Sequence, residues 1–225
     1  MKEKTLEKLS EEIKDWQYPS ALPAEWFGYK LTIKNEENGD MYDLFTYENV
    51  EERRSATAYF HEETMEYKFR VKIGLTEFCQ IQYINAKLGA FEKALQNYLE
   101  ASIHDLAEFN INTLSYIMQE QKITEWDYKP HLPPVLEGFE LYITPDRPVR
   151  VLNGSYIVFD YSDFSTKSNF IIYYNEFRNE FYGEARIKDI PEMNYIFDSK
   201  NLMELEDKLR EHLVDRLKGI KARSV

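Results

Sequence analysis

The sequence has very little of what most cofactor and catalytic motifs require. It holds one cysteine, Cys79, and eight glycines among 225 residues. A single cysteine excludes an internal disulfide and every zinc site built from several thiolates. The sequence contains no glycine-rich phosphate loop and no Gly-x-Ser-x-Gly segment, so neither a nucleotide-binding loop nor a serine nucleophile is indicated. We therefore predict no cofactor, and we interpret Cys79, in an apolar segment, as a packed side chain.

Long apolar runs and positive charge are also scarce. No stretch approaches the roughly 18–20 apolar residues of a membrane span, and the N-terminal segment is charged throughout, unlike a secretion signal. We expect a cytoplasmic protein without membrane contact. The chain has 28 Lys and Arg against 40 Asp and Glu, a net charge of −12. That charge disfavours binding to nucleic acid and complements a basic protein surface.

The sequence does contain a repeated segment. Ile13–Ile33 aligns without gaps with Ile123–Ile143, and eight of 21 positions are identical. The offset of 110 residues is close to half of the chain, so we predict a tandem duplication with units at residues 1–112 and 113–225. The identical pairs are Ile13/Ile123, Trp16/Trp126, Tyr18/Tyr128, Leu22/Leu132, Pro23/Pro133, Gly28/Gly138, Leu31/Leu141 and Ile33/Ile143.

Both halves show the same order of helical and strand-like periodicity. In the first half the pattern predicts helices over 3–16 and 87–107, and strands over 28–34, 41–47, 55–61, 65–73 and 78–84. In the second half it predicts helices over 113–124 and 201–219, and strands over 139–144, 155–161, 168–175, 180–188 and 193–198. We thus predict an α+β fold made of two α-β5-α units. Each unit is an antiparallel meander whose one apolar face is covered by a long C-terminal helix.

This order of elements resembles the tandem halves of the TATA-binding-protein fold. The resemblance rests on element order and on no sequence motif, so it implies an arrangement and carries no activity. The DNA-reading saddle of that family is basic, opposite to the net charge of −12 found here.

Histidines next to carboxylates are candidates for metal binding or acid–base chemistry. On the helix over 87–107, Glu100, His104 and Glu108 follow one another at four-residue spacing. That spacing places an imidazole between two carboxylates on one helix face, and these are metal-ligand types. A solvated acidic face is the alternative interpretation. A second histidine, His61, lies in the acidic segment 61–66, where a general acid–base role and an ordinary hairpin turn are both open.

The fourth strand differs between the halves. Phe69 and Val71 of the first half correspond to Gly183 and Ala185 of the second, which removes side-chain volume from the second sheet. Three explanations are open: a neighbouring aromatic side chain such as Phe177 fills the space, the helix over 201–219 approaches more closely, or a small apolar ligand pocket lies beneath that helix.

The functional expectation follows from charge, tyrosine content and missing catalytic motifs. We expect a non-catalytic protein-interaction or regulatory module, with a basic protein as the complementary partner. The alternative is a ligand-binding or enzymatic domain with a pocket between sheet and helix of the second unit. Four cations near the C-terminus, within residues 216–223, have two interpretations: a patch for nucleic acid or membrane, or a complement to the helix C-terminus.

Overall fold

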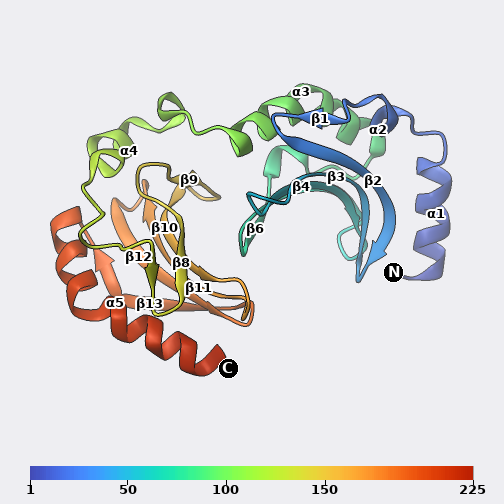
Figure 1. Cartoon of the computed structure of the whole chain (residues 1–225). Helices are drawn as coiled ribbons and strands as arrows, with labels where there is room; N and C mark the ends of the chain where they lie inside the picture. Colours follow the sequence, from blue (N-terminus) through green and yellow to red (C-terminus); the bar gives the residue numbers. More distant parts are fainter. Residues whose placement is uncertain (225) are drawn as a thin grey trace. The chain divides into compact units, whose positions relative to one another are not determined.

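Two antiparallel sheets, one in each half of the chain, carry the fold (Figure 1). The computed structural model describes residues 1–224, and the chain divides into the units Met1–Glu108 and Phe109–Val225. The fold is α+β, as predicted. The predicted boundary between residues 112 and 113 falls inside the short 3-10 turn η2 (Ile111–Thr113). No described helix is both long enough and apolar enough to cross a membrane.

The first unit is a six-stranded meander in which each strand pairs with its neighbours in sequence. Its strands are β1 (Glu25–Trp26), β2 (Tyr29–Asn38), β3 (Met41–Asn49), β4 (Arg54–His61), β5 (Glu66–Ile73) and β6 (Thr76–Cys79). Its helical elements are α1 (Glu3–Ile13), α2 (Tyr18–Ala21), the 3-10 turn η1 (Ile81–Tyr83) and α3 (Leu88–Ala107).

The long helix α3 packs against the apolar face of this sheet. Along β5 the odd-numbered residues from Tyr67 to Ile73 are buried, as period-two alternation requires. The Phe91 ring of α3 stacks on the Tyr67 ring with centroids 5.5 Å apart. The centroid of the Trp16 ring lies 6.4 Å from that of Phe45 and 6.5 Å from that of Phe91, so the repeated tryptophan packs against this core.

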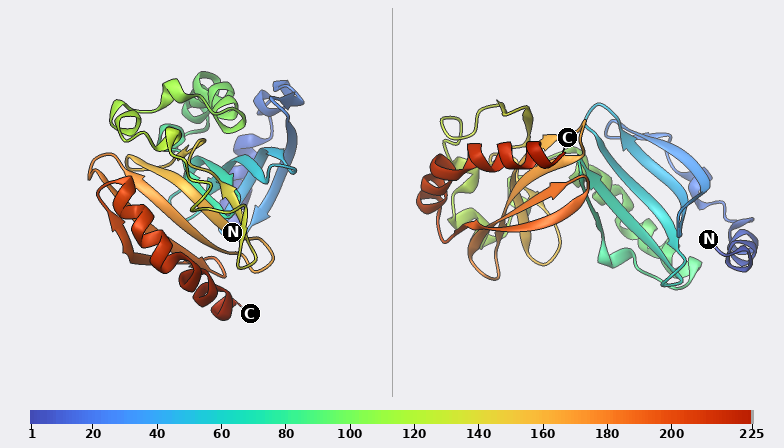
Figure 2. Two further views of the ribbon diagram at one scale, coloured as in Figure 1. Left: turned by 60° about the vertical axis from the view of Figure 1, so that its left-hand side comes forward. Right: turned by 90° about the horizontal axis from the view of Figure 1, so that it is seen from below.

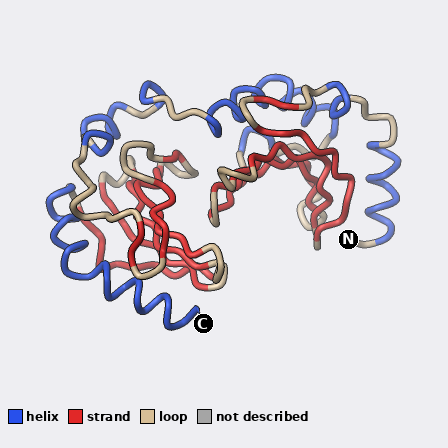
Figure 3. The backbone as a smooth tube through the Cα atoms, viewed as in Figure 1, coloured by secondary structure: helices blue, strands red, loops and turns tan. Residues whose placement is uncertain are grey.

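The second unit begins with short helical turns joined by loops (Figure 3) and continues into a seven-stranded sheet. The helical elements are η2, α4 (Tyr116–Glu120), η3 (Ile123–Glu125) and α5 (Leu202–Ser224). The strands are β7 (Val135–Leu136), β8 (Phe139–Ile143), β9 (Val149–Arg150), β10 (Ser155–Asp163), β11 (Ser168–Asn175), β12 (Glu180–Ile187) and β13 (Ile190–Ser199). The strand order is β13-β12-β11-β10-β8-β7, with β9 paired to β10.

Helix α5 lies across one face of the second sheet (Figure 2). Its leucine stripe recurs about once per helical turn and is buried together with inward-facing residues of β10, β11 and β12. The buried residues of α5 are Leu205, Leu209, Leu213, Leu217, Ile220 and Ser224.

Each repeated segment builds a small β-hairpin, which the periodicity did not predict. β1 pairs with β2, and β7 pairs with β8, across the two-residue turns Phe27-Gly28 and Glu137-Gly138. All four turn residues have positive φ, 49° and 82° in the first turn and 52° and 85° in the second. Positive φ at both central positions defines the type I′ turn, whose twist suits a hairpin and whose second position favours glycine.

The expected five strands in each sheet are therefore corrected to six and seven. The additional strands β1, β7 and β9 have two residues each and are too short to show a period in the sequence. The expected helix over 113–124 is also corrected. Ser115 caps α4 by accepting a hydrogen bond from the Met118 N–H, and Lys122 takes a left-handed conformation that ends the helical run before η3.

Burial of the two central strands of the second sheet departs from the expected half-covered sheet. Every residue of β10 and β11 is buried, including polar residues on the face opposite α5. Asp160 and Asn169 are both fully buried. A strand buried on both faces carries polar groups only where they hydrogen-bond one another, and this applies to Asp160 and Asn169.

Candidate functional site

The three predicted metal ligands on α3 do not gather into one group, although two of them lie close together. His104 Nε2 lies 3.6 Å from a Glu108 carboxylate oxygen. The imidazole also meets the Phe27 ring edge-on at 5.0 Å. Helix α3 ends at Ala107, and Glu108 follows it with an extended backbone. Glu100 does not join them within 4.8 Å, the separation that defines the one three-residue group found among the described residues. Metal binding there stays a prediction.

The residues of the predicted pocket lie in different environments. A Cβ built on Gly183 would come within 2.9 Å of the Asn194 backbone oxygen, and Ala185 is fully buried in the core beneath α5. Phe177 is 77% exposed and its ring covers Gly154 instead. A neighbouring aromatic does lie in this core: the fully buried Phe197, whose ring centroid is 4.8 Å from that of Phe170. The pocket stays a prediction, and the three residues named for it are not brought together.

The basic residues at the end of α5 form ion pairs within the second unit. Arg216 and Arg223 both contact the carboxylate of Glu192, at 3.0 and 2.8 Å. Lys221 lies 2.9 Å from Asp163, and Lys218 lies 3.9 Å from a carboxylate oxygen of Glu137. These contacts hold the helix on its sheet and neutralise the cations. They favour the structural interpretation of this segment over a nucleic-acid or membrane patch.

One group of three metal-ligating residues does gather, in the first unit. Asp40, His61 and Glu63 each offer one ligand atom, and the three atoms lie within 4.8 Å of one another. The sequence pointed to His61 and Glu63 but missed Asp40. The β3–β4 register supplies it, because Met41 pairs with His61 and Asp40 precedes Met41. Two strands joined by a single turn have a predictable register, so that pairing was the signal available.

Exposed apolar side chains concentrate on β13, the edge strand of the second sheet. The exposed fractions are 70% for Ile190, 44% for Met193, 72% for Tyr195 and 54% for Ile196. We call these four residues the β13 apolar row. The sequence signal for this row was that apolar residues occupy both odd and even positions of one strand. In a strand with one buried face, apolar residues would occupy only every second position. Exposed apolar side chains gathered on one strand are a candidate interaction surface.

The outer edge of β13 is poorly suited to pairing with another strand. Among described residues β13 pairs only with β12. Pro191 lacks a backbone N–H, and the pairing with β12 becomes irregular between Asn194 and Ser199. A partner would therefore be held by side-chain contacts with the β13 apolar row more than by strand addition.

Glu192 and Arg216 anchor the strand that carries this row. Hydrogen bonds from Arg223 and Arg216 lower the pKa of Glu192 to about 2, although burial acts against them. Glu192 thus stays ionised at neutral pH and ties β13 to α5.

Comparison of the chain with protein-family models, curated protein sequences and solved structures found no match. Functional inference therefore rests on the geometry of these surfaces.

Proposed function

We propose that the chain is a non-catalytic interaction protein that binds a basic protein partner through the β13 apolar row. The proposal rests on four exposed apolar residues that lie on one edge strand, namely Ile190, Met193, Tyr195 and Ile196. Tyrosine and methionine are enriched in protein interfaces, and an apolar centre with a polar rim is typical of them. The net charge of −12 makes a basic partner the complementary one and accelerates its encounter. The lone free Cys79 suits a reducing compartment, so we propose that the interaction occurs in the cytoplasm.

We also infer that the two units arose by tandem duplication. Matching contacts support this inference. The Trp16 indole N–H donates to Glu92 at 2.6 Å, and the Trp126 indole N–H donates to Glu206 at 2.6 Å. Tyr47 donates to the Pro23 carbonyl at 2.6 Å, and its counterpart Tyr161 donates to the Pro133 carbonyl at 2.7 Å. The two matching type I′ turns would likewise derive from one ancestral unit. Partner binding through β13 would then be a property acquired by the second unit alone.

Affinity capture with a matched pair of variants tests the proposed function. The chain is immobilised through its first unit, which leaves the second unit free, and is incubated with an extract of its own cells. The double variant Tyr195→Ser/Ile196→Ser removes apolar contact area without touching the core. We expect capture of a basic protein to fall about tenfold or more, as expected when central apolar contacts are lost. Capture should also weaken at high salt, because charge complementarity is screened.

Val50→Ser is the control, because Val50 is an equally exposed apolar residue, at 74%, in the first unit. It should capture the same protein as the unmodified chain. Circular dichroism establishes that all three chains are folded. Equal recovery by the double variant and by Val50→Ser would show that the β13 apolar row is not the binding surface. Sedimentation velocity on the purified chain separates this outcome from self-association through the same row.

A further inference from the structure

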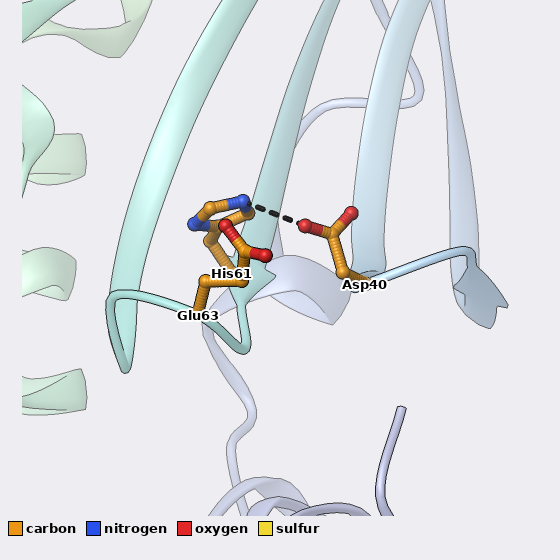
Figure 4. A group of neighbouring side chains, drawn as sticks. All are labelled: Asp40, His61 and Glu63. Carbon is orange, nitrogen blue, oxygen red and sulfur yellow. Dashed lines mark ion pairs between the residues drawn. The ribbon is translucent and has the colours of Figure 1, made fainter.

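The hairpin tips of the first unit bring an imidazole and two carboxylates together at a fixed position. Asp40 lies in the β2–β3 turn, and His61 ends β4. Glu63 lies in the following β4–β5 turn. A backbone hydrogen bond joins the two tips, from the Glu62 N–H to the Asp40 carbonyl at 2.9 Å. The three side chains thus converge from two adjacent turns (Figure 4).

The separations suit a small divalent ion after minor side-chain adjustment. His61 Nε2 lies 3.0 Å from Asp40 Oδ2, and one ligand atom from each of Asp40, His61 and Glu63 lies within 4.8 Å of the other two. Ligand atoms bound at about 2.1 Å around a tetrahedral ion are about 3.4 Å apart. The neighbouring Glu62 is already engaged, since its carboxylate accepts the Lys2 N–H at 2.8 Å. Glu63, which is exposed, remains for the ion.

The imidazole of His61 is held in place by a neighbouring hydroxyl group. His61 Nδ1 lies 3.1 Å from the Thr64 hydroxyl oxygen. A polar side chain other than the two carboxylates thus holds one ring nitrogen of His61.

This arrangement leaves His61 Nε2 facing Asp40. Unless a proton or a cation lies between them, a nitrogen lone pair and a carboxylate oxygen oppose each other at 3.0 Å. A metal-binding histidine usually has its other ring nitrogen held by a second polar group, as Thr64 holds Nδ1 of His61. An imidazolium–carboxylate ion pair is the competing explanation.

We propose that Asp40, His61 and Glu63 bind a divalent first-row transition-metal ion such as Zn²⁺, with Thr64 as the residue that positions the imidazole. One nitrogen and two oxygen ligands suit Zn²⁺ better than Mg²⁺ or Ca²⁺, which prefer all-oxygen sets. The ion links the β2–β3 and β4–β5 turns, and open coordination positions face solvent. This site lies in the first unit and does not depend on the β13 apolar row.

Isothermal titration of the chelator-treated, untagged full chain with ZnCl₂ tests the site. We expect one bound Zn²⁺ per chain and a melting temperature that rises with the metal. His61→Ala should abolish this binding, and Asp40→Asn should weaken it about tenfold or more. Thr64→Val should weaken it about tenfold, whereas Thr64→Ser, which keeps the hydroxyl, should restore it. His104→Ala is the matched control, because His104 is also a histidine beside carboxylates.

The nitrogen NMR signals of His61 report metal binding directly in the unmodified chain, without any variant. Zn²⁺ should shift Nε2 while Nδ1 keeps its proton. Absence of stoichiometric binding would overturn the proposal and leave the ion pair as the role of these residues. Loss of binding in His104→Ala with retention in His61→Ala would also overturn it, and would move the metal to Glu100, His104 and Glu108 on α3.

Discussion

Asp160 makes the stability of the second unit depend on pH in a direction opposite to that of most carboxylates. Burial raises its pKa to about 7, although hydrogen bonds from Ser162 and Asn169 and the Arg186 charge act in the opposite sense. Because the pKa is higher in the folded state, the folded chain binds the proton over a range where the unfolded chain does not. The stabilisation from the protonated form is present below about pH 4 and is lost as pH rises through about 7.

The size of the effect follows from the pKa of Asp160 in the folded and unfolded chain. The difference between 3.8 and about 7 corresponds to about 4 kcal/mol, since one pKa unit is ~1.36 kcal/mol. Over the accessible window from about pH 5 to about pH 8, linkage gives a loss of roughly 2–3 kcal/mol in the free energy of unfolding. Ser162 Oγ donates to Asp160 at 3.0 Å and Asn169 Nδ2 at 3.3 Å, the contacts that the ionised form retains.

Urea unfolding of the unmodified chain and of Asp160→Asn across that window measures this effect. The amide does not titrate, so the two chains should differ in pH slope by roughly 2–3 kcal/mol over the window. The Asn169 side chain can turn to meet the new amide, because its Oδ1 accepts no hydrogen bond from a described residue. Other titrating groups are shared by both chains and cancel. Identical pH slopes would refute the assignment of a raised pKa to Asp160.

The remaining predictions concern single side chains and backbone conformation. Gly138→Ala should destabilise by about 1–2 kcal/mol because φ is +85°; Gly219→Ala, with open space in α5, should stabilise by about 0.5–1 kcal/mol. Urea midpoints check both, and equal shifts would contradict the backbone explanation. Trp126→Phe should cost about 1–2 kcal/mol because the donor to Glu206 is lost; an unchanged midpoint would contradict this. Burial raises the pKa of the Cys79 thiol, so it should react with a disulfide reagent more slowly than a free thiol; an equal rate would count against the placement.

Strand periodicity carried much of the fold because it depends on local geometry. Alternate residues of β5 must face opposite sides of the sheet. The sequence alone therefore predicts which side is buried, the one that carries Tyr67, Phe69, Val71 and Ile73. The stripe of α5 does the same at helical spacing. Features of two residues, such as the hairpin strands β1 and β7, have no period and were visible only as the unexplained repeated glycines Gly28 and Gly138.

The candidate sites divide along the same line. The sequence alone determined the α+β class, the acidic charge, the long helices and the presence of His61 within an acidic turn. Only tertiary structure decided that Asp40 joins His61 across a strand register, and that α3 ends at Ala107, one residue before Glu108. The exposed row on β13 is likewise a tertiary property. Its apolar residues resemble core residues in the sequence, and only the end position of the strand in the sheet leaves them outside.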